Sequence, residues 1–349
     1  MITPYIAPDT LHHGGGLLEA ARHSNIPLTQ WIDLSTGINP NGWPVPEVPA
    51  SLWQRLPEEN DGLEQAAAQY YSQPPENFMI TAGSQSIIQL LPKVIPKGTV
   101  WVPSEGYAEH PYWWDFSNHD VFFYQQEDLD ALLDAGNALT MLPFDTLLII
   151  NPNNPTTVTH PKQILEDLLS LVSRHNKRLI IDEAFLDTQP EQSMIEHCKS
   201  PHIAVFRSLG KFFGLAGIRC GFLFTHVNLI DELRKWTGPW AVANPSRWIA
   251  KHALLDKHWH IDTTNKLKSE SQRLHTLMTT LISDSDIKRC DASDYFCSIV
   301  FTSNNAMTNV KQQLANRAIL TREFTTENRL RIGLPGNEQQ WQHLEHALA

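Results

Sequence analysis

The stretch that decides the fold is residues 146–182, which read TLLIINPNNPTTVTHPKQILEDLLSLVSRHNKRLIID. An apolar run at 146–150 opens the stretch, another at 178–181 closes it, and a segment of helical length at 161–175 separates them. Two nearly continuous apolar strands joined through a helix predict parallel neighbours in a sheet that is covered on both faces.

The same alternation continues on both sides of this stretch. Further predicted strands lie at 99–102, 121–124, 203–206 and 221–224. Together they predict an α/β fold with a mainly parallel sheet flanked by helices in a large domain. Because ligands of such sheets collect beyond the carboxyl ends of the strands, polar residues at those ends are the first candidates for a site.

The pattern of predicted helices and strands changes after Pro239 and Pro245. Longer helical stretches at 246–258 and 262–282 come first. Shorter strands at 297–302, 319–324 and 330–334 follow them, with helices near 307–317 and 338–347. This pattern predicts a smaller α+β domain at the C-terminus. The first forty residues are rich in Gly and Pro and are expected to be irregular. We therefore expect an N-terminal arm at 1–40, a large domain at 41–245 and a small domain at 246–349.

Composition limits the class of function. The 349 residues include 27 Lys and Arg against 38 Asp and Glu, a net charge of −11, which argues against a general nucleic-acid or membrane binder and favours small anionic ligands. Four cysteines without metal-ligand spacing predict reduced thiols. No apolar stretch approaches the roughly 20 residues that span a bilayer. We expect a cytoplasmic protein with no membrane contact and no metal site.

The segment at 207–219, RSLGKFFGLAGIR, contains one lysine in apolar, glycine-rich surroundings. Lost hydration favours the neutral amine of Lys211 and makes it a nucleophile toward an aldehyde. The Ser208 hydroxyl and the Arg219 guanidinium can hold a phosphate. An amine, a phosphate cradle and a partner for a ring nitrogen are the parts of a pyridoxal 5'-phosphate site. The alternative is a basic residue beside a buried loop.

Two further strand ends carry suitable groups. Gly83, Ser84 and Gln85 precede an apolar helix, whose free N–H groups and dipole can hold a phosphate, although capped helices without a ligand are as common. Asp182 follows a buried strand, where a carboxylate needs a cation such as a protonated pyridine nitrogen. An aspartate that caps the next turn is an equal alternative.

Two more candidates follow other strands. Asn154 lies in a turn between Pro152 and Pro155, where a rigid backbone can present its amide to a ring oxygen. Tyr107 can stack on the face of an aromatic ring. Taken alone, these residues are equally compatible with an ordinary turn and a core tyrosine.

The order and spacing of these residues resemble the fold type I pyridoxal-phosphate enzymes of the class I and II aminotransferase family, over nearly the whole chain. The resemblance implies an aspartate-aminotransferase-like fold, pyridoxal 5'-phosphate as cofactor, a large cofactor-binding domain, an arm that packs on the small domain and active site, and a homodimer. It implies that Lys211 is the catalytic Schiff-base lysine. The implied cofactor-binding residues are Gly83, Ser84, Gln85, Tyr107, Asn154, Asp182, Ser208, Lys211 and Arg219.

The implied substrate-binding residues are His13, Asn39, Arg322 and Arg331. Arg331 matches the family's C-terminal arginine that receives a substrate anion. The alternative for Arg322 is a surface ion pair with Glu323. A polar arm residue such as His13 or Asn39 more often satisfies local backbone groups.

Within the family, the motifs at 13–15, 33–40 and 182–187 resemble those of the threonine-phosphate decarboxylases, and next those of the histidinol-phosphate aminotransferases. Phe185 agrees with the first group. The resemblance implies decarboxylation of L-threonine O-3-phosphate to (R)-1-amino-2-propanol phosphate and CO2 in cobalamin biosynthesis. The alternatives are an aminotransferase acting on histidinol phosphate or an aromatic amino acid, and a cofactor-binding protein without turnover. Leu56, in place of the usual tyrosine, and the segment 239–244 depart from the family pattern.

Overall fold

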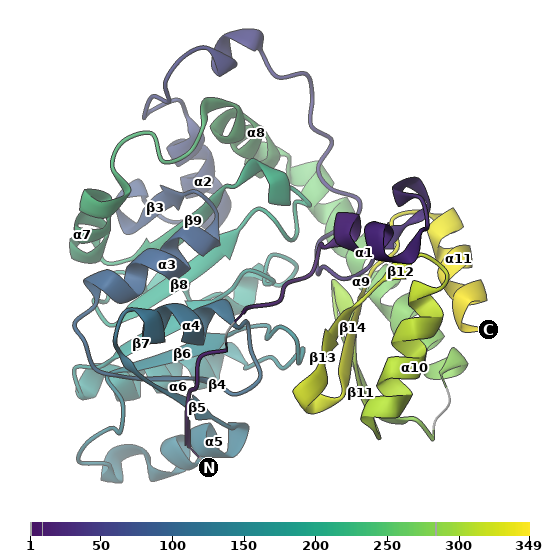
Figure 1. The fold of residues 1–349 in the computed structure, drawn as a ribbon. Helices are drawn as coiled ribbons and strands as arrows, with labels where there is room; N and C mark the ends of the chain where they lie inside the picture. Colours follow the sequence, from purple (N-terminus) through teal and green to yellow (C-terminus); the bar gives the residue numbers. More distant parts are fainter. Residues whose placement is uncertain (1, 9, 283–284) are drawn as a thin grey trace. The chain divides into compact units, whose positions relative to one another are not determined.

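The computed structural model describes residues 2–8, 10–282 and 285–349, and its chain forms two compact units (Figure 1). Unit 1 comprises the described residues of Met1–Leu11, Trp43–Asn154 and Val158–Lys257. Unit 2 comprises His12–Gly42, Pro155–Thr157 and the described residues of His258–Ala349. These units are defined by packing alone, so the predicted division into arm, cofactor domain and small domain stays a prediction.

Unit 1 contains an eight-stranded sheet in the order β1-β5-β4-β6-β7-β8-β9-β3 within the described part of the chain. Neighbours from β5 to β8 are parallel, whereas β1 pairs antiparallel with β5, and β9 pairs antiparallel with both β8 and β3. The predicted α/β fold with a mainly parallel sheet is therefore confirmed. The strands are β1 (Thr3–Pro4), β3 (Phe78–Thr81), β4 (Thr99–Pro103), β5 (Asp120–Tyr124), β6 (Thr146–Ile150), β7 (Arg178–Asp182), β8 (Ile203–Ser208) and β9 (Gly221–Thr225).

An amphipathic helix of unit 1 buries an apolar stripe, as α6 shows. In α6 the buried residues Leu165, Leu168, Leu169 and Val172 recur at helical spacing, which is why the segment forms an amphipathic helix. All five residues of β6 are buried, as a strand covered on both faces requires. The helices are α2 (Leu63–Tyr71), α3 (Ser84–Val94), α4 (Glu109–Phe116), α5 (Gln126–Ala135), α6 (Lys162–Arg174), α7 (Val227–Thr237) and α8 (Asn244–Leu255).

Unit 2 is built on a four-stranded antiparallel sheet in the order β10-β11-β14-β13. A short parallel pair, β2 with β12, lies in the same unit. This unit confirms the predicted smaller α+β part of the fold. Its strands are β2 (Ile32–Asp33), β10 (Ile287–Ser293), β11 (Phe296–Phe301), β12 (Ile319–Leu320), β13 (Arg322–Phe324) and β14 (Arg329–Gly333). Its helices are α1 (Leu17–Ser24), α9 (Lys257–Leu281), α10 (Asn304–Ala315) and α11 (Glu338–Leu348).

Two local expectations are wrong. The strand expected at 319–324 is two strands, because β12 pairs with β2 while β13 pairs with β14. The first forty residues are not irregular throughout, since Leu17–Ser24 form α1, which ends at Asn25 in the left-handed conformation that commonly terminates helices. Among the described residues, none of the helices combines the length and hydropathy that crossing a bilayer requires.

Candidate active site

Lys211 lies in a tight turn that follows β8. The backbone N–H of Gly210 donates to Ser208 Oγ at 3.2 Å, and Leu215 N–H donates to the Leu209 carbonyl at 3.1 Å. These bonds close the turn and leave Lys211 half-buried, with its Nζ 4.9 Å from the centre of the Phe185 ring. The amine therefore faces an apolar ring on a rigid support, as a positioned nucleophile requires.

Asp182 is the last residue of β7 and is 5% exposed. Its Oδ1 accepts from the Ala184 N–H at 3.0 Å, so the turn-capping role is realised. Its Oδ2 lies 2.9 Å from His110 Nε2, on α4. His110 is not among the residues predicted from the sequence, although its spacing of three residues from Tyr107 at the start of a helix was the available signal. Asp182 thus has a buried hydrogen-bonded partner besides its local bond.

The N-terminus of α3 has the features of an anion cradle. Gly83, its N-cap, has φ of +73° and makes no side-chain cap bond, and Ser84 and Gln85 open the helix. A Cβ built on Gly83 would lie 2.6 Å from Arg219 Nη2, so only glycine lets the guanidinium approach the helix end this closely. The structure therefore brings Arg219 against the N-terminus of α3, and the guanidinium and the helix end together attract a phosphate.

Tyr107 and Gln85, predicted separately, are brought together. The Tyr107 hydroxyl donates to Gln85 Oε1 at 3.1 Å, and the Tyr107 ring packs edge-on against His110 with centres 6.0 Å apart. Tyr107, the candidate stacking ring, thus contacts Gln85 at the start of α3 and His110, the partner of Asp182.

The turn after β6 is closed by its own side chains. Asn151 Nδ2 donates to the His160 carbonyl at 3.1 Å, and Asn151 Oδ1 accepts from the His160 N–H at 2.8 Å. Asn153 Nδ2 donates to the Glu105 carbonyl at 3.0 Å. These bonds hold the turn that presents Asn154 beyond the end of β6.

A buried ion-pair network underlies the strand ends. The Arg207 guanidinium lies 3.1 Å from Glu183 Oε2 and 2.6 Å from Asp187 Oδ1, and the three side chains are at most 1% exposed. Burial raises the pKa of Glu183 despite the charge of Arg207. Glu183 follows Asp182, and Arg207 precedes Ser208. The network therefore holds in place the backbone of both candidate residues, Asp182 and Ser208.

Unit 2 holds the predicted substrate residues. In the antiparallel pairing of β13 with β14, Arg322 lies directly opposite Arg331. Arg322 Nη2 donates to the His12 carbonyl at 2.5 Å, and burial lowers the Arg322 pKa. Arg331 is 6% exposed and donates to the Ser35 carbonyl. The structure therefore makes Arg322 and Arg331 directly opposed residues of neighbouring strands, and it pairs Glu323 with Lys311.

The two arm candidates are less clearly placed for binding. Asn39 is buried and its Oδ1 accepts from the Asn41 N–H at 2.9 Å, as expected of a residue that satisfies local backbone groups. His13 is exposed. All four substrate candidates belong to unit 2, whereas every cofactor candidate belongs to unit 1.

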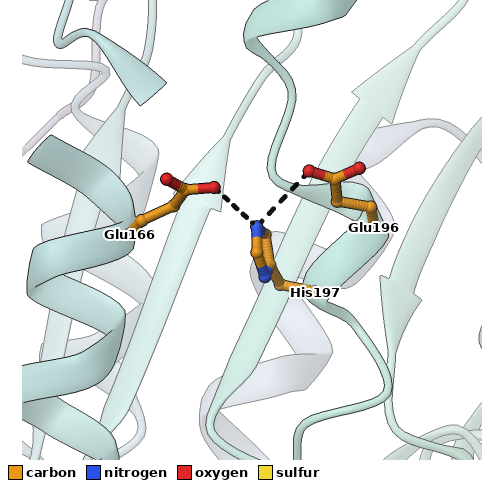
Figure 2. A group of neighbouring side chains, drawn as sticks. All are labelled: Glu166, Glu196 and His197. Carbon is orange, nitrogen blue, oxygen red and sulfur yellow. Dashed lines mark hydrogen bonds and ion pairs between the residues drawn. The ribbon is translucent and has the colours of Figure 1, made fainter. Parts of the chain in front are cut away.

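A separate cluster of titratable groups lies on unit 1. Figure 2 shows the Glu166 and Glu196 carboxylates pointing toward His197 Nε2, at 3.1 and 3.6 Å. These ligand atoms lie close enough together to hold a metal ion. The Lys162 ammonium already pairs with Glu196, so the cluster also has the composition of a surface ion-pair network. The expectation of no metal site stays a prediction.

The family model and the relatives that this sequence matches point to one family of proteins. The family model described as aminotransferase class I and II matches residues 56–348. Threonine-phosphate decarboxylase of Pseudomonas aeruginosa is 40% identical over 97% of both chains, and that of Sinorhizobium sp. is 32% identical over 97% of both. Both relatives carry the name of the subfamily whose motifs this chain resembles.

Solved structures agree with the fold. Histidinol-phosphate aminotransferase from Sinorhizobium meliloti, in complex with pyridoxal-5'-phosphate, superposes with a TM-score of 0.77 at 20% identity over 97% of both chains. L-threonine-O-3-phosphate decarboxylase from Porphyromonas gingivalis gives 0.68 at 18% identity, covering 86% of this chain and 94% of that one. These likenesses confirm the aspartate-aminotransferase-like fold. The chain belongs to the aminotransferase class I and II family, as its motifs predict.

Proposed function

We propose that this protein is a pyridoxal-phosphate-dependent decarboxylase that converts L-threonine O-3-phosphate into (R)-1-amino-2-propanol phosphate and CO2 in cobalamin biosynthesis. The structural observation that carries the substrate class is the pairing of Arg322 directly opposite Arg331. Like charges directly opposite on neighbouring strands are destabilising, so an anionic ligand relieves their repulsion. Two guanidinium groups match the charge and the several acceptor oxygens of a phosphate.

The residues of unit 1 fit pyridoxal 5'-phosphate. Arg219, Ser208 and the first N–H groups of α3 form a donor set for its phosphate, and the bare Gly83 leaves the backbone accessible. The Asp182 carboxylate suits a protonated ring nitrogen, and Lys211 supplies the amine. When bound, the cofactor supplies an aldehyde for covalent attachment and a ring that accepts electrons from the reacting carbon.

The side chains of the substrate residues decide which bond breaks. In our proposal Arg322 and Arg331 would hold the substrate phosphate, which leaves the substrate carboxylate unbound by these guanidinium groups and free to depart as CO2. Lys211 would be the base or acid that moves the proton. If Arg331 held the substrate carboxylate instead, that group would be retained and transamination would be the expected reaction.

Phe185 supports the decarboxylase. It is 5% exposed and lies beside the Lys211 amine, where a tyrosine would add a hydroxyl. The apolar ring restricts the position of the amine without offering a further hydrogen bond. This is also the residue that agrees with the decarboxylase motif.

Product analysis tests the proposal. Purified protein loaded with pyridoxal 5'-phosphate is incubated with L-threonine O-3-phosphate, and we expect CO2 and aminopropanol phosphate in equal amounts. Keto acid formed instead, with conversion of the cofactor to its amine form, would establish the aminotransferase alternative. Binding of the cofactor with no product across a panel of donors would indicate a protein without turnover. Lys211→Ala is the control and should give no product and no visible absorbance band of bound cofactor.

We also infer a homodimer in the cytoplasm. Trp53, Leu56 and Trp240 of unit 1 are 68%, 61% and 57% exposed, and their two segments adjoin, since Asn244 Nδ2 donates to the Leu56 carbonyl at 3.0 Å. Large apolar side chains that gather on one exposed face are typical of a surface covered by a partner. Light scattering should give twice the chain mass of 39.6 kDa, and an active species of that single mass would contradict the dimer.

The three buried thiols Cys198, Cys220 and Cys297 suit a reducing compartment.

A further inference from the structure

A chain of hydrogen bonds connects the first turns of α3 and α4. Tyr107 Oη donates to Gln85 Oε1 at 3.1 Å, and Gln85 Nε2 donates to Glu109 Oε2 at 2.5 Å. The same carboxylate oxygen accepts from Trp113 Nε1 at 2.6 Å. Glu109 is only 8% exposed and none of the roles derived above uses it.

The chemistry of Glu109 determines the direction of every bond in this chain. An ionised carboxylate only accepts hydrogen bonds, so the Gln85 amide must turn its NH2 group toward Glu109. Its carbonyl oxygen then faces Tyr107, whose hydroxyl must act as the donor. Without the carboxylate, the two ends of the Gln85 amide would be interchangeable and the tyrosine hydroxyl could either donate or accept.

The position of Glu109 explains why a buried charge is tolerated there. It is the first residue of α4, where the helix dipole favours a negative charge, and α4 has no side-chain cap. Donors from Gln85 and Trp113 complete its stabilisation. The acid is thus held on one side by α4 itself and on the other by the second residue of α3.

We propose that Glu109 is a positioning residue for the cofactor: through the Gln85 amide it fixes the Tyr107 hydroxyl and thereby orients the Tyr107 ring. The inference rests on the proposed function, because Tyr107 and the α3 cradle are the groups that would contact the ring and the phosphate of pyridoxal 5'-phosphate. Glu109 itself touches neither the cofactor nor the substrate in this scheme. Its effect on cofactor affinity must therefore pass through the Tyr107 hydroxyl.

A double-mutant cycle tests this dependence. The variants are Glu109→Ala, Tyr107→Phe, which keeps the ring, and the combination of the two. We measure the dissociation constant of pyridoxal 5'-phosphate and the absorbance maximum of the bound cofactor, with the melting temperature of the cofactor-free protein as a check on folding. Each single variant should weaken binding about 10-fold, because each breaks the chain that orients the Tyr107 ring and this is the upper range for loss of one ordinary hydrogen bond. The double variant should bind the cofactor no more weakly than the single variant that has the larger dissociation constant.

Two further variants complete the design. Glu127→Gln removes a charge from the first turn of α5, where the side chain is exposed, and should leave affinity and absorbance unchanged. Glu109→Gln should recover the melting temperature but not the affinity, because an amide does not determine the orientation of Gln85.

The outcomes separate the two proposals. Losses that multiply to about 100-fold in the double variant, or wild-type affinity in Glu109→Ala, would overturn the positioning role and leave the proposed function intact. A wild-type protein that forms no borohydride-trapped adduct at Lys211 would overturn the proposed function and this inference with it.

Discussion

His110 Nε2 lies 2.9 Å from Oδ2 of Asp182, and the two side chains are 1% and 7% exposed. The imidazole comes from the first turn of α4 and the carboxylate from the end of β7. A buried carboxylate is expensive unless hydrogen bonds replace its lost hydration, and His110 supplies one beyond the local turn. The bond to His110 therefore holds the Asp182 carboxylate at the end of β7, where it is available to a cationic ring nitrogen.

Replacing His110 by Phe should lower turnover about 10-fold. The ring volume is retained, but Asp182 loses the hydrogen bond that orients it, and one bond to a charged group is worth about this much. Steady-state kinetics and the absorbance maximum of the bound cofactor measure the effect. His119→Phe is the matched control, since His119 is also buried but its Nε2 lies 2.8 Å from the Pro92 carbonyl. It should lower the melting temperature while leaving the absorbance maximum unchanged; equal kinetic losses in both variants would contradict a specific role for His110.

Arg322→Gln should raise KM for L-threonine O-3-phosphate about 10-fold or more without destabilising the free protein. The variant removes one of two guanidinium groups for the substrate phosphate, and it also removes a like charge opposite Arg331. Kinetics with phosphorylated and unphosphorylated threonine, combined with thermal melts, separate these effects. An unchanged KM for the phosphorylated substrate would argue against a phosphate site at this pair.

Arg207→Leu should lower the free energy of unfolding by about 3 to 5 kcal/mol, because it leaves Glu183 and Asp187 as buried charges without their cation. Urea unfolding monitored by fluorescence measures the loss. Arg234→Leu is the control, since the Arg234 and Asp231 side chains are 58% and 59% exposed and such pairs contribute about 0 to 1 kcal/mol. A loss as small as that of the control would show that the buried network adds little to stability.

The contact of α2 with α8 should depend on pH. Burial by itself raises the pKa of Asp61, but hydrogen bonds from Arg247 and the Leu63 N–H, together with the Arg247 charge, hold it below the ordinary value. A lowered carboxylate pKa contributes stability that is present above the ordinary value of about 3.9 and is lost as pH falls through the lower folded-state value.

Asp61→Asn measures this contribution. Wild type should be the more stable protein at pH 7, and its advantage over Asp61→Asn should shrink as pH falls below about 4. Denaturant unfolding at a series of pH values provides the comparison. A difference that stays constant across this range would show that ionisation of Asp61 does not contribute.

The sequence by itself determined the class of fold and the main chemical groups. Continuous apolar strands and amphipathic helices such as α6 are local patterns, so their periodicity predicts a covered, mainly parallel sheet. The family motifs around Lys211 and Asp182 are contiguous in the chain, and their order along it identifies the family without knowledge of packing.

Only the tertiary structure decided which partner each polar side chain meets. His110 and Asp182 are 72 residues apart, and they meet because α4 begins beside the end of β7. The pairing of Arg322 with Arg331 depends on strand register, and the split of 319–324 depends on two competing sheets. Hydrophobic periodicity records which face of an element is buried but carries no information on register or on the element that covers that face. Contacts across the chain therefore become visible only after folding has placed those elements.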